Sequence, residues 1–176
     1  RERNGNYLER CLSLGSIPPE FKEELLRKQI SILESGGSPP DDPLSLAKKL
    51  SNGVQRAQPY TLDYTKENSA KNLREFLFEG KAGHCEYFAT TLALMLRLEN
   101  IPSRIVTGFR PGRTNFFNNY QIIRQSDAHS WVEAFLGPGV GWATFDPTPS
   151  TSEVPSALAQ NLGFLMDIYD YFQLQW

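Results

Sequence analysis

The spacing of hydrophobic positions changes near residue 100 and divides the chain into a helical part and a strand-rich part. Before this point, apolar residues recur at helical spacing over 18–34, 43–54 and 72–78. Residues 60–64 alternate between apolar and polar side chains, as a half-buried strand would. The first part is therefore predicted to be mainly helical, with one short strand.

Beyond residue 100 the chain is rich in β-branched and aromatic residues separated by Gly, Pro and Asn, which predicts short strands. We expect them over 102–109, 119–125, 129–136 and 141–146. The sequence GPGVG, at 137–141, lies between the last two and predicts a hairpin whose strands pair antiparallel. Helices followed by an antiparallel meander predict an α+β fold rather than an α/β fold.

The helix expected between the two parts is apolar nearly all round from Cys85 to Leu98, which predicts a central, buried helix. The preceding GKAG holds a helix poorly, so we expect the helix to begin near His84 or Cys85. A helix N-terminus offers unpaired N–H groups and a positive dipole end, which favour a thiolate and a developing oxyanion. Cys85 is therefore a candidate nucleophile; the alternative is an inert core cysteine.

A nucleophilic cysteine needs a base that a third group holds in orientation. His84 is adjacent in sequence, but consecutive helical residues do not face each other, so we favour a loop-packing or surface role for it. His129 begins one strand of the expected hairpin and Asp146 ends the other. Because a hairpin brings these ends together, we predict His129 as the base and Asp146 as its orienting carboxylate.

Two alternatives stay open for this site. Asp127 lies two residues before His129 and would point to the same side of a strand, although we favour a turn role for it. Cys85, His129 and a carboxylate could also bind zinc, but no second cysteine or histidine stands at a recognised spacing. Cys11 lies far from these motifs, and we predict no disulfide between Cys11 and Cys85.

Composition narrows the classes of partner. The 176 residues are 40% hydrophobic and 22% charged, which predicts one folded, soluble domain with a sizeable core. A net charge of -2 implies no broad basic surface for nucleic acid. The only adjacent acidic pair in a loop is Asp41–Asp42, without calcium-loop spacing, so we predict no metal and no cofactor. The chain starts at Arg1 without a signal peptide, and we expect it to belong to a longer protein.

Three separated motifs, in order, resemble the transglutaminase-like superfamily, and most nearly the core of bacterial membrane-anchored transglutaminase-like proteins. They are GHCEYFATTLALMLRLENIPSRIVTGF, QSDAHSWVEAFL and GWATFDPTPS, and the resemblance covers about residues 40–150. It implies a papain-like α+β fold in which the nucleophilic cysteine starts a buried helix packed on an antiparallel sheet. It also implies a catalytic triad of Cys85, His129 and Asp146.

The activity implied by this resemblance is cysteine-dependent acyl transfer on carboxamide groups through a thioester. The expected substrate is a protein or peptide, including those of the cell envelope. The alternatives are a thiol protease or amidase of the same fold, or a non-catalytic module that binds protein or cell wall. The aromatic residues of 116–120 are candidates to line the substrate cleft.

The resemblance also implies a division of the chain and a location. We expect an N-terminal helical extension at 1–40, a catalytic core at 41–150, and a tail at 151–176 that leads towards a membrane segment of the parent protein. The domain is then a periplasmic part of a bacterial inner-membrane protein. It would contact the membrane only through the anchors of that parent.

Overall fold

The structure is a computed structural model that describes residues 2–35, 40–63, 65–111, 120–121 and 123–149. The chain divides into two compact units, each treated by itself: Arg1–Thr107 with Ser130–Pro149, and Gly108–His129 with Ser150–Trp176. The first unit includes the helices that the sequence assigned to an extension at 1–40. The expected boundaries at 40 and 150 stay a prediction, and the tail at 151–176 lies outside the described residues.

The helices of the described residues are α1 (Glu2–Arg10), α2 (Pro19–Glu34), α3 (Pro43–Ala57), α4 (Leu73–Phe78) and α5 (Cys85–Leu98). Their starts follow from local chemistry. Asp42 accepts a hydrogen bond from the Ser45 N–H at 2.8 Å and caps α3. Asn72 does the same for α4 through the Glu75 N–H at 3.0 Å. None of these helices has the length and hydrophobicity that a membrane span requires.

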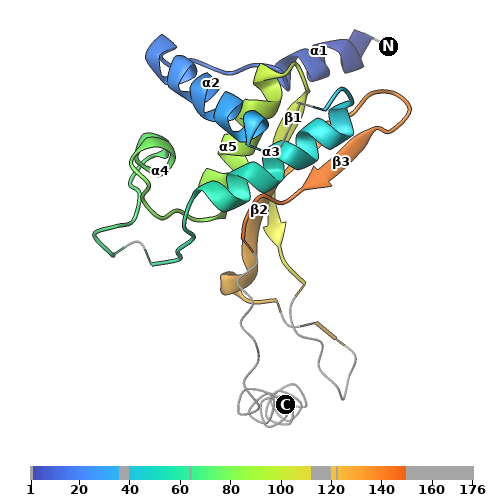
Figure 1. Ribbon diagram of the computed structural model, residues 1–176. Coiled ribbons are helices and arrows are strands. Elements are labelled where there is room, and N and C mark those ends of the chain that lie inside the picture. Colours follow the sequence, from blue (N-terminus) through green and yellow to red (C-terminus); the bar gives the residue numbers. More distant parts are fainter. Residues whose placement is uncertain (1, 36–39, 64, 112–119, 122, 150–176) are drawn as a thin grey trace. The chain divides into compact units, whose positions relative to one another are not determined.

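The strands β1 (Ser103–Phe109), β2 (Ala128–Phe135) and β3 (Trp142–Phe145) form a sheet in the order β1-β2-β3 (Figure 1). The strands β2 and β3 pair antiparallel, from Val132 opposite Phe145 to Phe135 opposite Trp142. Gly137 and Gly141 carry φ of 99° and 77° in their connection, a conformation that suits glycine. The predicted α+β class and the hairpin at 137–141 are confirmed.

Two predicted strands are wrong within the described residues. Tyr60 forms an isolated bridge with Gly83 and Leu62 is 60% exposed, so the described residues 60–63 belong to no named strand. In the segment 119–125 no described residue belongs to a named strand, and Gln125–Asp127 is a 3-10 turn. In both segments the alternation of residue types was not matched by a neighbouring strand among the described residues.

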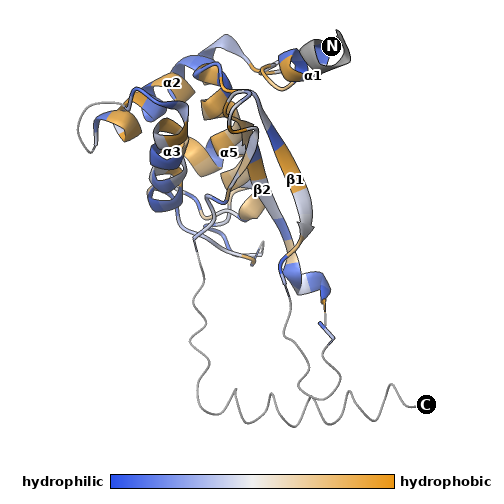
Figure 2. Ribbon diagram, turned by 90° about the vertical axis from the view of Figure 1, so that its right-hand side faces the viewer, coloured by the Kyte–Doolittle hydropathy of each residue, from blue (hydrophilic) through white to orange (hydrophobic). Residues whose placement is uncertain are grey.

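The core of the first unit is built around α5, as the sequence predicted. Figure 2 shows α5 largely hydrophobic in colour, whereas much of α3 is hydrophilic. Phe88, Leu92 and Met95 of α5 are fully buried and join Leu50 of α3 and Val132 of β2 in one apolar cluster. Burying one such side chain contributes about 1.5–3 kcal/mol. This packing fixes the axis of α5 and therefore the position of its first residue.

Candidate active site

Cys85 is the first residue of α5, and His84 is the N-cap. The thiol is free and half-buried, and Cys11, the other cysteine, is also a free thiol. The His84 carbonyl accepts the N–H groups of Tyr87 and Phe88 at 3.0 and 3.4 Å, and no side chain caps this helix end. The thiol therefore lies beside the positive end of the helix dipole.

The backbone just before Cys85 is held on both sides by hydrogen bonds. The Gly83 N–H donates to the Pro59 carbonyl at 3.0 Å, and the Gly83 carbonyl accepts the Thr61 N–H at 2.9 Å. The Ala82 carbonyl accepts the Ala70 N–H at 2.8 Å. These contacts hold residues 79–84, the pre-helix loop, against the segment that precedes α4.

Gly83 is where this loop packs most tightly. A Cβ at this position would lie 2.6 Å from Cδ2 of Phe76 and 2.9 Å from Cδ2 of Tyr87. Phe76 is fully buried, with its ring centroid 4.8 Å from that of Phe88, so it cannot move aside. Glycine at residue 83 therefore lets the chain reach Cys85 without displacing the Phe76 ring.

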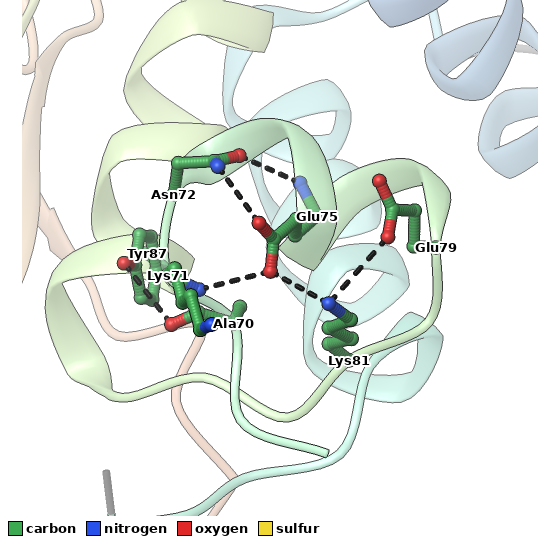
Figure 3. Close-up of polar contacts among 7 residues, drawn as sticks. All are labelled: Ala70, Lys71, Asn72, Glu75, Glu79, Lys81 and Tyr87. Atoms are coloured by element: carbon green, nitrogen blue, oxygen red, sulfur yellow. Dashed lines mark hydrogen bonds and ion pairs between the residues drawn. The ribbon is translucent and has the colours of Figure 1, made fainter. Parts of the chain in front are cut away.

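A polar network around Glu75 ties the pre-helix loop to α4 (Figure 3). Glu75 Oε2 accepts hydrogen bonds from Lys81 Nζ at 2.8 Å and from the Lys71 N–H at 3.2 Å. Glu75 Oε1 accepts Asn72 Nδ2 at 3.0 Å, and Lys81 Nζ also lies 3.6 Å from Glu79. The Lys81 ammonium lowers the pKa of Glu75 and is itself held protonated, because Glu75 raises the pKa of Lys81.

His84 packs in the pre-helix loop. Its ring centroid lies 4.6 Å from that of Tyr87, and its Nδ1 lies 3.9 Å from Glu86 Oε2. Burial lowers the pKa of His84, and the Glu86 carboxylate only partly opposes this. His84 is therefore disposed to stay neutral at pH 7.

Asp146 directly follows β3 and is exposed. Its Oδ1 accepts the Thr148 N–H at 3.0 Å, which closes a local turn. The Thr148 carbonyl in turn accepts Gln55 Nε2 of α3 at 3.0 Å. The turn after β3 is thus tied to the helical part of the first unit, the unit that also contains Cys85.

His129 belongs to the second unit, where it is the second residue of β2 and is buried. Its Nε2 lies 3.0 Å from Nη2 of Arg110. Because a guanidinium only donates hydrogen bonds, Nε2 is the acceptor in this contact. Asp127 Oδ2 accepts the Arg124 N–H at 2.7 Å, which is the turn role favoured for it by the sequence.

Some of these features were missed by sequence reasoning. The spacing of Asn72 and Glu75 is that of a capping box and could have been recognised. The Lys81–Glu75 pair and the Arg110–His129 contact depend on how loops turn, and no sequence pattern gives that. The loop at 116–120, expected to line a cleft, lies outside the described residues except for Tyr120. Within the described ranges no group of three or more His, Cys, Asp or Glu could hold a metal ion.

Comparison with known proteins gives two curated relatives. A protein-glutamine gamma-glutamyltransferase of Pseudomonas aeruginosa is 38% identical over 93 residues, which cover 53% of this chain and 14% of that protein. The Bacillus subtilis protein YebA is 37% identical over 87 residues, which cover 47% of this chain and 12% of YebA. The chain thus spans a small part of the length of either relative.

Among solved structures, the periplasmic domain of TgpA from Pseudomonas aeruginosa is similar to this chain, with a TM-score of 0.64 and 27% sequence identity. The match covers 90% of this chain and 52% of that domain. A family model, the transglutaminase-like superfamily, matches residues 32–147, a range that contains Cys85, His129 and Asp146. Because the family model covers more than half of the chain, the chain belongs to the transglutaminase-like superfamily.

Proposed function

We propose that this chain is a cysteine-dependent acyltransferase that acts on the carboxamide of protein glutamine side chains. The observation that carries the proposal is Cys85: a free, half-buried thiol at the N-terminus of a central helix. The family and the name of the Pseudomonas relative support acyl transfer in general. The tight packing around Gly83 supports a nucleophile held in one place.

In this proposal His129 is the base and Asp146 orients it. The register of β2 and β3 supports the pairing, since Val132 lies opposite Phe145. The next step of that register would set Trp131 opposite Asp146. His129 precedes Trp131 by two residues along β2, so their side chains share one side of the strand. Diagonal neighbours across an antiparallel pair are within reach of long or aromatic side chains.

The reaction then proceeds in two halves. The Cys85 thiolate attacks the carboxamide carbon, the protonated His129 gives its proton to the leaving nitrogen, and ammonia departs as a thioester forms. An acceptor amine gives a proton to His129 and attacks the thioester, which restores the thiolate and leaves a new amide. The Cys85 N–H at the helix start is the proposed donor to the oxyanion.

Arg110 bears on the protonation step. Both ring nitrogens of an imidazolium are donors, so the acceptor role of His129 Nε2 towards Arg110 is incompatible with the charged ring. Formation of the thiolate–imidazolium pair therefore requires that Arg110 move away from Nε2. In the proposed triad the Asp146 carboxylate stabilises the charge of the imidazolium.

We further infer that the domain works outside the cytoplasm, in a longer protein that supplies membrane anchors. The periplasmic origin of the TgpA domain supports this location. Protein substrates of the cell envelope are then the accessible class. The same thioester can instead pass to water, which would make the chain an amidase.

A glutamine-containing peptide incubated with a fluorescent primary amine tests the proposal, with products read by mass spectrometry. We expect amine incorporation by the wild type and none by Cys85→Ala, with both proteins equally folded by circular dichroism. Conversion of glutamine to glutamate alone would replace the proposal by the amidase alternative. No product across a panel of peptides, together with an unreactive Cys85, would leave a binding module as the function.

A further inference from the structure

An open groove of about 690 Å³ lies between α2 and α3, and Cys85 is not among its lining residues. Figure 1 shows these two helices side by side. The lining positions of α3 recur every three to four residues from Ser45 to Arg56 and so form one face of that helix. Over these 11 residues the face extends about 16 Å.

The groove is lined by cations. Lys28 contributes from α2, and Lys48, Lys49 and Arg56 contribute from α3. Among the described residues, no Asp or Glu lines the groove, and Lys28, Lys48 and Arg56 form no ion pair. The chain as a whole has a net charge of -2, so this local positive charge is not a consequence of a basic protein. Lys28, Lys48 and Arg56, in a concave groove with no lining carboxylate, attract anions.

The floor of the groove is apolar and firm. The uncharged lining residues are Ile32, Gly53 and Ala57, which are apolar, together with Ser31, Ser35, Ser45 and Asn52. A Cβ on Gly53 would lie 2.0 Å from Cγ2 of Ile32, so the two helices are in direct contact at the floor. A ligand that fits this surface carries negative charges together with apolar groups.

We propose that the groove binds an acidic peptide segment of a partner protein, with Asp or Glu side chains on Lys48 and Arg56 and apolar side chains on the floor. Lys48 and Arg56 are eight residues apart, about 12 Å along the helix, which an extended peptide spans in about four residues. A flat lipid surface does not enter a concave groove, and a phosphate polymer has no apolar groups for Ile32 and Ala57. An acidic peptide therefore matches both the charges and the floor.

Fluorescence anisotropy of a dye-labelled peptide of alternating Glu and Leu tests this proposal. The groove variant is Lys48→Gln with Arg56→Gln. The matched control is Arg10→Gln with Lys22→Gln, which removes the same charge from exposed positions outside the groove. We expect the groove variant to weaken binding about tenfold and the control less than about twofold, because each exposed pair contributes modestly. Binding should also weaken as salt is raised.

Three results would overturn the proposal. The first is no saturable binding of the peptide to the wild type, and the second is equal weakening in the two variants, which would indicate non-specific attraction. The third is groove-dependent binding of polyphosphate or of phosphatidylglycerol vesicles that is tighter than that of the peptide. Thermal unfolding of both variants establishes that a loss of binding is not a loss of fold, and Cys85 chemistry is not involved in any readout.

Discussion

The pre-helix loop that leads to Cys85 and the hairpin that carries Asp146 are fixed by different forces. Side chains fix the loop: the Phe76 ring leaves no room for a Cβ at Gly83, and Lys81 is bound by Glu75. Backbone register fixes the hairpin, and Asp146 itself is exposed after the last paired residue. A small change should therefore cost stability in the loop, but activity at the hairpin.

The largest expected effect lies at the hairpin. Asp146→Asn should lower turnover by orders of magnitude, because in the proposed triad His129 would lose the charge that stabilises its imidazolium. A comparable change in a serine enzyme costs about ten-thousand-fold, and we expect less here because a thiol depends less on its base. Steady-state amine incorporation measures the loss, and the circular dichroism spectrum should not change.

Asp127→Asn is the matched control for this prediction. It removes a turn contact to Arg124 and should change turnover only a few-fold. The assignment of the orienting carboxylate is wrong if Asp127→Asn cripples the enzyme while Asp146→Asn does not.

The largest stability effect is expected in the loop. Gly83→Ala forces a methyl group into the fully buried Phe76 ring and should destabilise the protein by about 1–3 kcal/mol. Gly139→Ala in the hairpin turn meets no atom within 4 Å and should stay within about 0.5 kcal/mol of the wild type. Urea unfolding compares the two. Equal free energies of unfolding would remove the proposed difference between the two regions.

Lys81→Met should have a smaller effect, because it removes one partner from a network with several bonds to Glu75. We expect the alkylation rate of Cys85 to fall severalfold as the pre-helix loop loosens. The control is Lys66→Met, at an exposed pair with Asp63, which should leave the alkylation rate unchanged.

The folded pKa of Glu75 lies below its usual 4.5. Its stabilisation is therefore present above pH 4.5 and is lost as the pH falls through the folded value.

The direction of this pKa shift predicts how the stability of Lys81→Met responds to pH. The difference in thermal stability between wild type and Lys81→Met should narrow as the pH falls below about 4.5, because the wild type then also loses the charged pair. A difference that widens on acidification would show that the pair does not stabilise the folded chain.

The smallest effect is expected at His84. Burial lowers its folded pKa below the usual 6.5, so the unfolded chain binds more protons as the pH falls below 6.5, and stability declines there. His84→Gln removes this titration and should flatten the decline, by about two degrees in Tm or less. Melting curves between pH 7 and pH 5 measure it; a steeper decline in the variant would contradict the burial argument.

The sequence predicted those parts of the fold that depend on local chemistry. The Asp42 cap sets the start of α3, and glycines at 137 and 141 set the hairpin, because each acts through its own backbone conformation or nearest N–H groups. The all-round apolar pattern of α5 likewise requires burial in any soluble fold. Cys85 at a helix start follows from the same local signals.

Other features depend on partners distant in sequence. Residues 60–64 have strand-like alternation in the sequence, but among the described residues 60–63 no named strand is formed, and Leu62 is exposed. Nothing in the sequence predicts that Lys81 turns back onto Glu75 or that Arg110 donates to His129, since both contacts require the path of a loop. For the same reason the basic groove was missed: its residues look like ordinary solvated helix positions until α2 and α3 are seen in contact.

The central claim is that His129, and not His84 beside it in sequence, activates the Cys85 thiol. The pH dependence of Cys85 alkylation tests this claim most directly. The rate of Cys85 alkylation by iodoacetamide is measured against pH for wild type, His129→Ala and His84→Ala. Circular dichroism first establishes that each protein is folded. We predict a wild-type transition well below the free-cysteine value of about 8.5, a large upward move in His129→Ala, and little change in His84→Ala. A large upward move in His84→Ala with none in His129→Ala would contradict the assignment.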